Sequence, residues 1–263
     1  MNRIDQKFKE LAASNKKAFI AFITAGYPDL AVTEELALKL DKSGVDILEL
    51  GVPFSDPMAD GSIIQEASKS ALDKKTHLID ILKVVKKIRK SSAMPICLMT
   101  YYNPIFCFGE ENFVRQARQA GVDGVIIPDL PPEEARSFIS YSKKFGLDTI
   151  FFLAPTSAKK RIGMVSRVST GFIYYVSLTG VTGPRQSLPA DFSKQLNLIK
   201  NATKKPVCVG FGVSTPVQVK EVNKFADGVI VGSAIVRTIK ENIGKPDLVE
   251  KVCEFVRHLT GKA

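Results

Sequence analysis

Short apolar runs rich in Val, Ile and Phe recur along the chain and alternate with longer segments in which apolar residues return every three or four positions. The runs predict eight strands, at residues 18–24, 47–50, 95–100, 124–127, 149–153, 172–176, 207–210 and 228–231. The segments between them predict helices, among them residues 30–43, 78–89, 112–120, 133–145 and 216–225. Strands and helices therefore alternate throughout the chain.

The strands are apolar throughout rather than alternately polar and apolar, which indicates a parallel sheet covered by helices on both faces. Eight such strands can close into a barrel or stay open as a doubly wound sheet, and periodicity alone does not separate the two. The turn after the first strand, Ala25-Gly26-Tyr27-Pro28, lacks the G-x-G-x-x-G spacing of an open dinucleotide-binding sheet, and the glycine-rich turns come late in the chain. We therefore expect an α/β fold, a (β/α)8 TIM barrel with extra helices.

A short pattern recurs where helices give way to strands. Residues 43–46 read SGVD and residues 120–123 read AGVD, while residues 226–229 read ADGV, a degenerate copy. A glycine at this place can end the helix in a left-handed conformation.

Length and composition fit one domain spanning residues 1–263, since 263 residues with 45% hydrophobic content can form one large core. No apolar run approaches the ~18 residues of a membrane span, and the first seven residues are charged and polar rather than signal-like. We expect a cytoplasmic protein with no membrane partner. Cys97, Cys107, Cys208 and Cys253 have no metal-type spacing and are interpreted as buried free thiols, and the two histidines predict no metal site.

The formal charge of +10 raises the question of nucleic acid. The lysines, however, are dispersed in pairs without interleaved aromatic residues, as at 74–75, 86–87, 159–160 and 204–205, and solvated helix faces explain them better. We expect no nucleic-acid partner. The positive field can still steer an anionic substrate such as a phosphorylated metabolite.

Glu49 is a carboxylate among apolar residues near the end of the second predicted strand. The active site of a barrel forms at that end of the strands, and burial would raise the pKa of Glu49 toward general acid–base use. The alternative is a glutamate paired with a structural Arg or Lys. The following loop adds Asp56 and Asp60, one of which can face Glu49, although both can instead simply cap turns.

Glycine-rich turns follow the sixth, seventh and eighth predicted strands, at residues 180–183, 210–212 and 232–233. Glycines let backbone N–H groups approach a phosphate, and a helix beginning near Ser233 would direct its positive end at the same anion. We interpret the three turns together as a phosphate cradle. Aromatic residues near strand ends suit a flat apolar substrate, although in the pair Tyr174-Tyr175 alternation allows only one ring to point inward.

Together these motifs resemble a known family. The segment LELGVPFSDPMADG at residues 48–61 is similar to the signature of the tryptophan synthase α subunit, with both catalytic carboxylates in place. Further matching stretches are FITAGYP at 22–28, MTYYNP at 99–104, PDLP at 128–131, GVTG at 180–183, GFG at 210–212 and VGSAIV at 231–236. The resemblance covers essentially the whole chain.

The resemblance implies a lyase that cleaves indole-3-glycerol phosphate to indole and glyceraldehyde 3-phosphate in tryptophan biosynthesis, with Glu49 moving protons and an ionised Asp60 stabilising positive charge on the ring. It implies no cofactor in this chain, and a pyridoxal-phosphate-bearing β subunit as partner in an α2β2 heterotetramer. Asp56, Pro57 and Asn103 match family positions near that contact. The implied ring contacts are Phe22, Tyr101, Tyr174 and Phe211, the implied phosphate contacts are Gly183, Gly212, Gly232 and Ser233, and Thr182 is the implied loop partner of Asp60.

Two positions depart from the family pattern, Ser62 where proline is frequent and Pro184 where a small residue is common. Neither removes a catalytic group, while Pro184 affects the closure of its loop. The enzyme alternative is another phosphate-binding barrel, such as an indole-glycerol-phosphate synthase or a sugar-phosphate isomerase. A synthase is expected to use a lysine at a strand end, and none of the predicted strands contains or ends on one. A noncatalytic regulatory barrel subunit is the other alternative, against which the two carboxylates argue.

Overall fold

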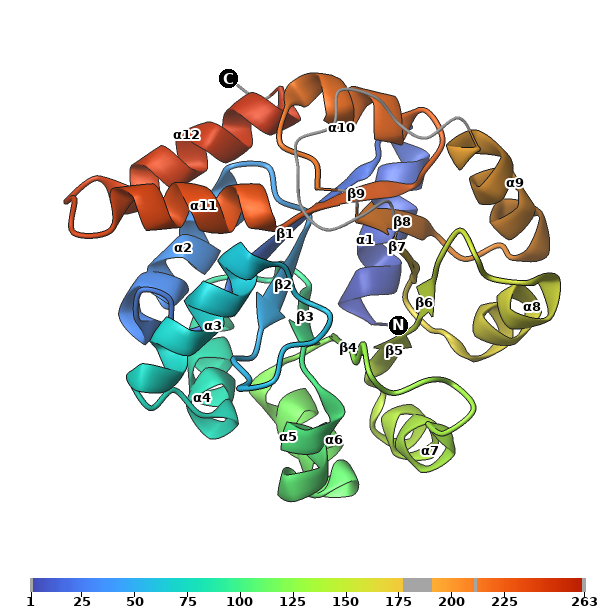
Figure 1. The fold of residues 1–263 in the computed structure, drawn as a ribbon, viewed down its shortest axis with the longest axis horizontal. Coiled ribbons are helices and arrows are strands. Elements are labelled where there is room, and N and C mark those ends of the chain that lie inside the picture. Colours follow the sequence, from blue (N-terminus) through green and yellow to red (C-terminus); the bar gives the residue numbers. More distant parts are fainter. Residues whose placement is uncertain (1, 177–190, 211, 262–263) are drawn as a thin grey trace.

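The computed structural model describes residues 2–176, 191–210 and 212–261, and in this part of the chain nine parallel strands alternate with helices (Figure 1). The strands are β1 (Ala18–Thr24), β2 (Ile47–Gly51), β3 (Ile96–Met99), β4 (Gly124–Ile126), β5 (Asp148–Ile150), β6 (Phe152–Leu153), β7 (Ile173–Val176), β8 (Val207–Gly210) and β9 (Gly228–Val231). The helices are α1 (Arg3–Ala13), α2 (Leu30–Lys42), α3 (Ser62–Asp73), α4 (Leu78–Ile88), α5 (Tyr102–Phe108), α6 (Glu110–Ala120), α7 (Arg136–Phe145), α8 (Lys159–Val168), α9 (Phe192–Ala202), α10 (Pro216–Asn223), α11 (Ser233–Asn242) and α12 (Leu248–Thr260).

The sheet closes on itself as a barrel. Its strand order is β5-β4-β3-β2-β1-β9-β8-β7-β6, so the first strand pairs with the last, which an open doubly wound sheet does not allow. The prediction of a single strand at residues 149–153 is wrong in detail, because β5 pairs with β4 and β6 pairs with β7, with Phe151 between them. The two short strands form one interrupted strand that changes its partner, and the predicted eight-stranded TIM barrel is confirmed with this division.

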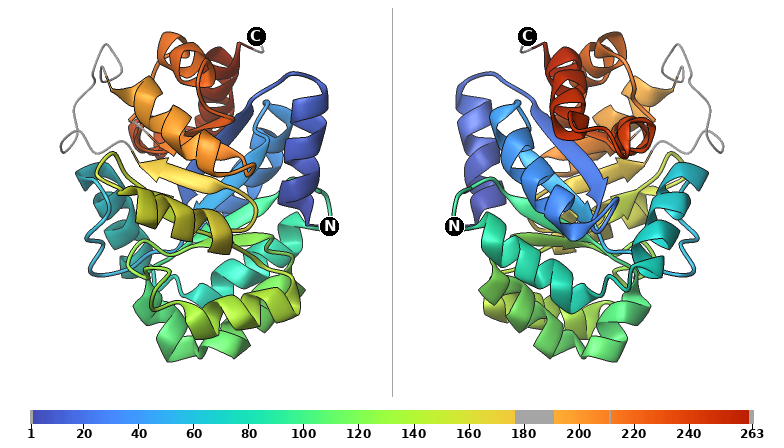
Figure 2. Two further views of the ribbon diagram at one scale, coloured as in Figure 1. Left: turned by 90° about the vertical axis from the view of Figure 1, so that its right-hand side faces the viewer. Right: turned by 90° about the vertical axis from the view of Figure 1, so that its left-hand side faces the viewer.

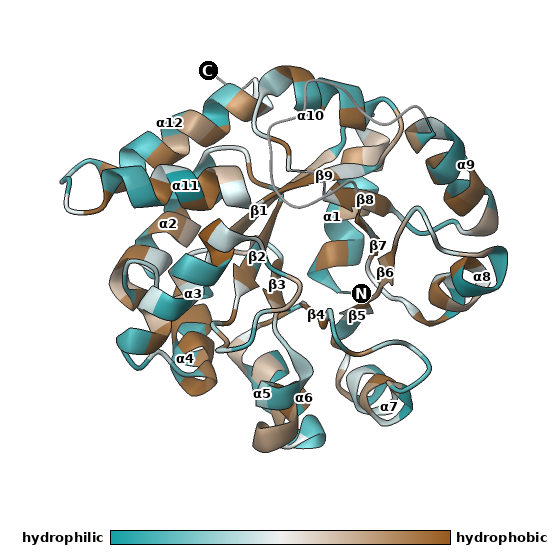
Figure 3. Cartoon of the chain, in the orientation of Figure 1, coloured by the Kyte–Doolittle hydropathy of each residue, from teal (hydrophilic) through white to brown (hydrophobic). Residues whose placement is uncertain are grey.

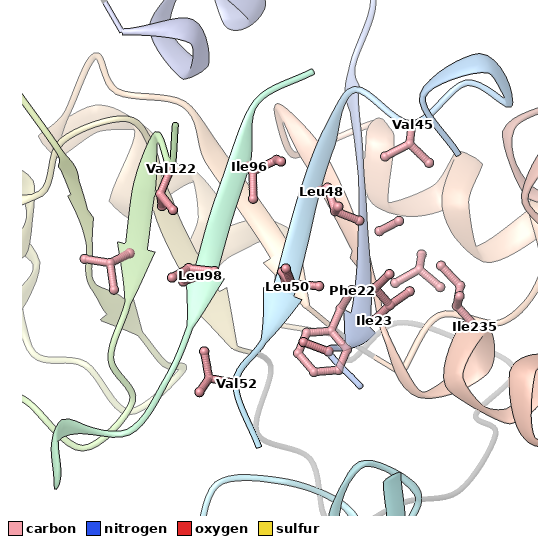
Figure 4. Close-up of a cluster of buried hydrophobic side chains, with 14 of the residues drawn as sticks. Phe22, Ile23, Val45, Leu48, Leu50, Val52, Ile96, Leu98, Val122 and Ile235 are labelled. Carbon is pink, nitrogen blue, oxygen red and sulfur yellow. The ribbon is translucent and has the colours of Figure 1, made fainter. Parts of the chain in front are cut away.

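Side chains of the strands form two cores. Leu48, Leu50 and Leu98 belong to the larger one, between the sheet and the helices, and Figure 4 shows them along neighbouring strands. The smaller core fills the inside of the barrel with Ala18, Ile20, Ile47, Cys97, Ile126, Ile150, Phe172, Cys208 and Ile230. Because both faces of each strand are buried, the strands are apolar throughout, and hydrophobic colour is concentrated on them in Figure 3.

Helix α1 closes the amino end of the barrel, a role that the apolar pattern did not predict. Its Ile4, Phe8 and Leu11 pack into the inner core, and Figure 2 places α1 at the side of the molecule opposite α3. The spacing of these three residues, four and then three positions, puts them on one helix face. The side chain of Asn2 caps the helix by accepting a hydrogen bond from Ile4 N.

The recurring pattern before the strands has a structural counterpart. Gly44 and Gly121 follow helices with φ of +98° and +100°, as predicted for left-handed helix ends. The aspartate of each copy then accepts a hydrogen bond from the backbone of a neighbouring strand: Asp46 from Phe19 N, Asp123 from Ile96 N and Asp227 from Val207 N. The pattern therefore ties adjacent strands together at the amino end of the barrel.

Several boundaries differ from the predicted ones by a few residues, most clearly in α7, predicted from residue 133 and beginning at Arg136 after two turn-forming prolines. Three of the four cysteines are buried as predicted, but Cys107 is exposed on α5, so its predicted burial is wrong. In the described part of the chain, no helix combines the length and apolar character that crossing a bilayer requires.

Candidate active site

Glu49 lies in the middle of β2 with its side chain fully buried. It is paired in register with Phe22 on one side and Cys97 on the other, and it alternates with Leu48 and Leu50 of the outer core, which directs it into the barrel. Neither carboxylate oxygen has a hydrogen-bond partner among the described residues. Among the described residues, Glu49 is therefore not paired with a structural Arg or Lys, which was the alternative interpretation.

The environment of Glu49 favours its protonated form. Burial, and to a smaller extent the nearby charge of Asp60, raise the pKa of Glu49 to about 8. A carboxylic acid that holds its proton at neutral pH can act as a general acid, and once it has given up that proton it can accept another.

Asp60 is held next to Glu49 by the loop that follows β2. Burial raises the pKa of Asp60 to about 6, while a hydrogen bond from the Tyr101 hydroxyl acts in the opposite direction. The same hydroxyl accepts a hydrogen bond of 2.9 Å from Ala59 N, and the Tyr101 ring stacks on Phe54 with 5.1 Å between the ring centroids. Tyr101 thus positions both the backbone and the carboxylate of this loop.

Asp56 is in a different situation. Its carboxylate accepts a hydrogen bond from the Ser55 hydroxyl, and the residue is exposed. The interpretation of both aspartates as turn residues thus fits Asp56, while Asp60 alone interacts electrostatically with Glu49.

Two aromatic rings border the carboxylates. A Cβ atom added to Gly51 would lie 2.5 Å from Cζ of Phe22, and one added to Gly210 would lie 2.7 Å from the Tyr174 hydroxyl. Both rings therefore occupy space that a side chain at the glycine would fill. The charges of Glu49 and Asp60 contribute to the strongly raised pKa of Tyr174, behind burial as the main cause, which places its hydroxyl near the pair.

Within the pair Tyr174-Tyr175 the rings point in opposite directions. Tyr174 packs against the inner core and lies 4.8 Å from Phe152, centroid to centroid, whereas Tyr175 belongs to the outer core. The alternation rule was therefore correct, and Tyr174 is the inward ring.

The two last strands end in glycines at the same edge. Gly212 follows β8 with φ of +53°, and no atom of the described residues lies within 4 Å of a Cβ added to it. Gly232 follows β9 and is the N-cap of α11, which begins at Ser233 as predicted. The positive end of the α11 dipole and its unpaired N–H groups therefore lie at this edge. Thr182, Gly183 and Phe211 lie outside the described residues, as do Gly180, Val181 and Pro184.

Some residues of this region were not singled out from the sequence. Phe152 and Met99 pack against the inner core. The alternation of side chains along their strands could have predicted that both point into the barrel. Phe54 stacks on Tyr101, a contact between two loops that no local pattern reveals. The hydroxyl of Thr24, at the end of β1, is buried without a hydrogen-bond partner among the described residues.

The arrangement places a protonated carboxylic acid and an ionisable carboxylate beside aromatic rings, on β2 and in the loop that follows it. In the described ranges no group of three or more His, Cys, Asp or Glu side chains is arranged to hold a metal ion. The residues present can move a proton and stabilise positive charge on a flat ring system.

Comparisons with known proteins agree on one family. The family profile described as "Tryptophan synthase alpha chain" matches residues 8–262. Proteins named tryptophan synthase alpha chain from Geotalea uraniireducens and Geobacter sulfurreducens are each 51% identical over 259 residues, covering 98% of this chain and 97% and 98% of the relatives.

Solved structures give the same result. The crystal structure of tryptophan synthase subunit alpha from Legionella pneumophila has a TM-score of 0.93 at 40% identity and covers 99% of this chain and 98% of that one. A chain of the tryptophan synthase complex from Pyrococcus furiosus has a TM-score of 0.86 at 38% identity and covers 93% of this chain and 98% of that one.

Proposed function

Because the chain belongs to the tryptophan synthase alpha chain family, we propose that Glu49 and Asp60 catalyse the cleavage of indole-3-glycerol phosphate to indole and glyceraldehyde 3-phosphate in this protein. The observation that carries the proposal is the buried carboxylate of Glu49, which has no hydrogen-bond partner among the described residues and lies near Asp60; this environment raises the pKa of Glu49 to about 8 and that of Asp60 to about 6. At neutral pH one group is an acid and the other is an anion, and the reaction needs both.

Glu49 moves the protons. It protonates C3 of the indole ring, and the bond between C3 and the glycerol side chain breaks, with its electron pair returning to the ring. The hydroxyl on the departing carbon loses its proton to the Glu49 carboxylate as its oxygen becomes that of the aldehyde. Glu49 ends protonated, as it began, so the chain needs no cofactor for this reaction.

Asp60 stabilises the intermediate. Protonation at C3 leaves positive charge on the ring nitrogen, and an ionised Asp60 accepts a hydrogen bond from that N–H. The hydrogen bond from Tyr101 favours the ionised form of Asp60 and opposes the effect of burial.

The binding residues follow from their places around this pair. Phe22, Tyr101 and Tyr174 border the indole ring, and Gly212, Gly232 and Ser233 receive the phosphate at the amino end of α11, where N–H groups and the helix dipole favour an anion. Phe211 is proposed to contact the indole ring and Gly183 to contact the phosphate. Thr182 is proposed to pair with Asp60. These three rest on the family motif alone.

The proposed partner is a tryptophan synthase β subunit carrying pyridoxal phosphate, in an α2β2 heterotetramer that receives the indole. Exposed apolar side chains support a contact beside the catalytic loop, since Met58 is 84% exposed and Phe106 of α5 is 66% exposed. Asp56, Pro57 and Asn103, which lie on the same two segments, belong to this contact. The proposed location is the cytoplasm, where the chain acts as one domain of residues 1–263.

An assay of indole release from indole-3-glycerol phosphate tests the proposal, on the purified chain with and without a β subunit. Glu49→Gln should lower kcat at least ~10³-fold, toward the upper end of what general acid–base catalysis supplies. Binding of glycerol 3-phosphate should remain, because Glu49 does not contact the phosphate. The matched control is Glu35→Gln, on the exposed face of α2, which should leave kcat unchanged. Near-normal turnover by Glu49→Gln would remove the residue from the mechanism.

A further inference from the structure

A cavity of about 340 Å³ lies at the amino ends of the strands, away from the catalytic carboxylates. Its lining comes from segments far apart in the sequence: the second half of α1 and the residues before β1, Lys200 of α9, residues 203–206 before β8, and Asp227 before β9. Figure 2 shows α1 at the side of the molecule opposite α3, which follows the catalytic loop. The cavity is therefore separate from the site described above.

The cavity gathers positive charge. Five lysines and one aspartate line it, a formal excess of four positive charges, the lysines being Lys16, Lys17, Lys200, Lys204 and Lys205. The sequence indicated dispersed pairs, and folding brings one of them, Lys204 and Lys205, together with Lys16, Lys17 and Lys200.

Most of this charge has no anionic partner. Asp227 pairs with Lys200 at 2.9 Å and with Lys17 at 3.5 Å. Lys205 donates to the backbone oxygen of Ser166 rather than to a carboxylate, and burial together with Lys143 lowers its pKa. No ion pair joins Lys16 or Lys204 to a carboxylate of the described residues.

Part of the cavity lining is apolar. Phe8 and Leu11 of α1 line it and are 8% and 9% exposed, and Pro206 also lines it. The volume is within the usual range for a small-molecule site, about 300–1,000 Å³. The lining therefore offers apolar side chains for a flat apolar group and lysines for anionic groups.

Three of the five lysines, Lys16, Lys17 and Lys204, are exposed, but all five line one concavity, and like charges brought together in a fold oppose its stability. An anion in the cavity would remove this repulsion and connect α1 to the segment before β8.

We propose that this cavity binds a small organic phosphate that carries two or more negative charges and a flat apolar group, and that the ligand stabilises the docking of α1 on the barrel. The site acts on stability rather than on catalysis, because its residues lie at the amino ends of the strands. A concave site of this volume suits a small molecule better than an extended polyanion such as RNA.

Calorimetric titration of the full-length chain tests the proposal with four probes: ADP, pyrophosphate, adenosine and a single-stranded uridine oligonucleotide. ADP should bind at one saturable site and raise Tm, because a ligand of the folded state stabilises it by mass action. Pyrophosphate should bind more weakly than ADP because it lacks the apolar group. Adenosine should bind least, and raising the salt from about 50 to about 200 mM should weaken ADP binding.

The double variant Lys16→Gln/Lys204→Gln removes two unpaired lysines and should weaken ADP binding at least tenfold and abolish the Tm increase. The control Lys42→Gln/Lys86→Gln removes the same charge from exposed positions on α2 and α4 and should bind ADP as the parent does. The rate of indole release should be the same in all three proteins. Unchanged ADP binding in the first double variant, tighter binding of the oligonucleotide than of ADP, or the absence of saturable ADP binding would overturn the proposal.

Discussion

The ring of Phe22 occupies the space on the inner side of Gly51 that any side chain at that position would fill. A Cβ atom there would lie 2.5 Å from Cζ and 2.7 Å from Cε2 of the ring, closer than real Cβ contacts allow. Gly51 follows Glu49 by two positions on the same strand, so both residues face the barrel interior. The glycine thus lets the Phe22 ring lie directly beside the strand that carries the proposed acid.

Gly51→Ala should therefore move the Phe22 ring into the space proposed for the indole ring. We expect KM for indole-3-glycerol phosphate to rise about tenfold and the free energy of unfolding to fall by about 1–3 kcal/mol, the usual cost of overpacking. Steady-state kinetics and urea unfolding measure the two effects. Gly163→Ala is the control, since a Cβ at this position of α8 has no atom of the described residues within 4 Å. That variant should keep KM and gain up to about 1 kcal/mol of stability. An unchanged KM in Gly51→Ala would mean that Phe22 does not border the bound ring.

Asp60→Asn should lower kcat by about 10²-fold or more while changing substrate affinity less, because the neutral amide cannot stabilise positive charge on the ring nitrogen. Asp56→Asn is the matched control on the same loop, and its carboxylate is exposed and hydrogen-bonded to Ser55. Single-turnover kinetics of the free chain separate this effect from any change at the partner contact. If Asp60→Asn retained the parent kcat, the charge-stabilising role would be excluded.

The dependence of kcat/KM on pH should be bell-shaped. Activity should rise through about pH 6 as Asp60 ionises and fall above about pH 8 as Glu49 loses its proton. These two apparent values describe the interacting pair.

Tyr101→Phe should shift the acid limb of this profile to higher pH. The phenol donates to Asp60 and lowers its pKa, so the loss of this hydrogen bond raises the pKa of the carboxylate. The alkaline limb should stay near its original position, because Tyr101 is not among the causes of the shift in Glu49. Tyr102→Phe is the comparison, since that hydroxyl donates to Glu110 instead. An acid limb that moves to lower pH or stays in place would contradict the assigned hydrogen bond.

Glu49 should also make the chain less stable as pH rises. Its pKa is about 8 in the folded chain and near the ordinary value of 4.5 when unfolded, so the folded state binds the proton more tightly and loses stability between these two values. Glu49→Gln has no such proton to lose. We therefore compare the free energy of unfolding of Glu49→Gln with that of the parent at two pH values. The variant's value minus the parent's should be larger at pH 8.5 than at pH 4.5 by at least about 1 kcal/mol, since one pKa unit corresponds to about 1.4 kcal/mol.

Urea unfolding of both proteins at the two pH values measures this difference. The buried Asp148, whose pKa is also raised, to about 7, is present in both proteins and cancels in the comparison. A difference between the two proteins that does not change with pH would show that Glu49 is not held in its neutral form.

Much of the barrel could be predicted from the sequence because its strands are buried on both faces and each carries a continuous apolar run. The limits of β1, β8 and β9 agree with the predicted ones. The division between β5 and β6 could not be predicted, because it reflects a change of pairing partner at Phe151 and not a change in local composition. Helix α1 could not be predicted from the apolar pattern because only Ile4, Phe8 and Leu11 are buried in an otherwise polar segment.

The site shows the same division between local and long-range information. Glu49 could be recognised because a carboxylate in an apolar strand is chemically unusual. Asp60 could not be separated from Asp56 by spacing, since the difference lies in a contact with Tyr101, 41 positions further along the chain. The lysine-lined cavity likewise could not be predicted from the sequence, because it forms only when α1 lies beside the segment that precedes β8.

The place of α1 also bears on how the chain is made. Ile4, Phe8 and Leu11 share the inner core with residues as distant as Cys208 and Ile230. Helix α1 precedes every strand in the chain, so it cannot complete its contacts until β8 and β9 have been synthesised. Until then the apolar face of α1 lacks part of its packing partners, so α1 finishes folding together with the last strands.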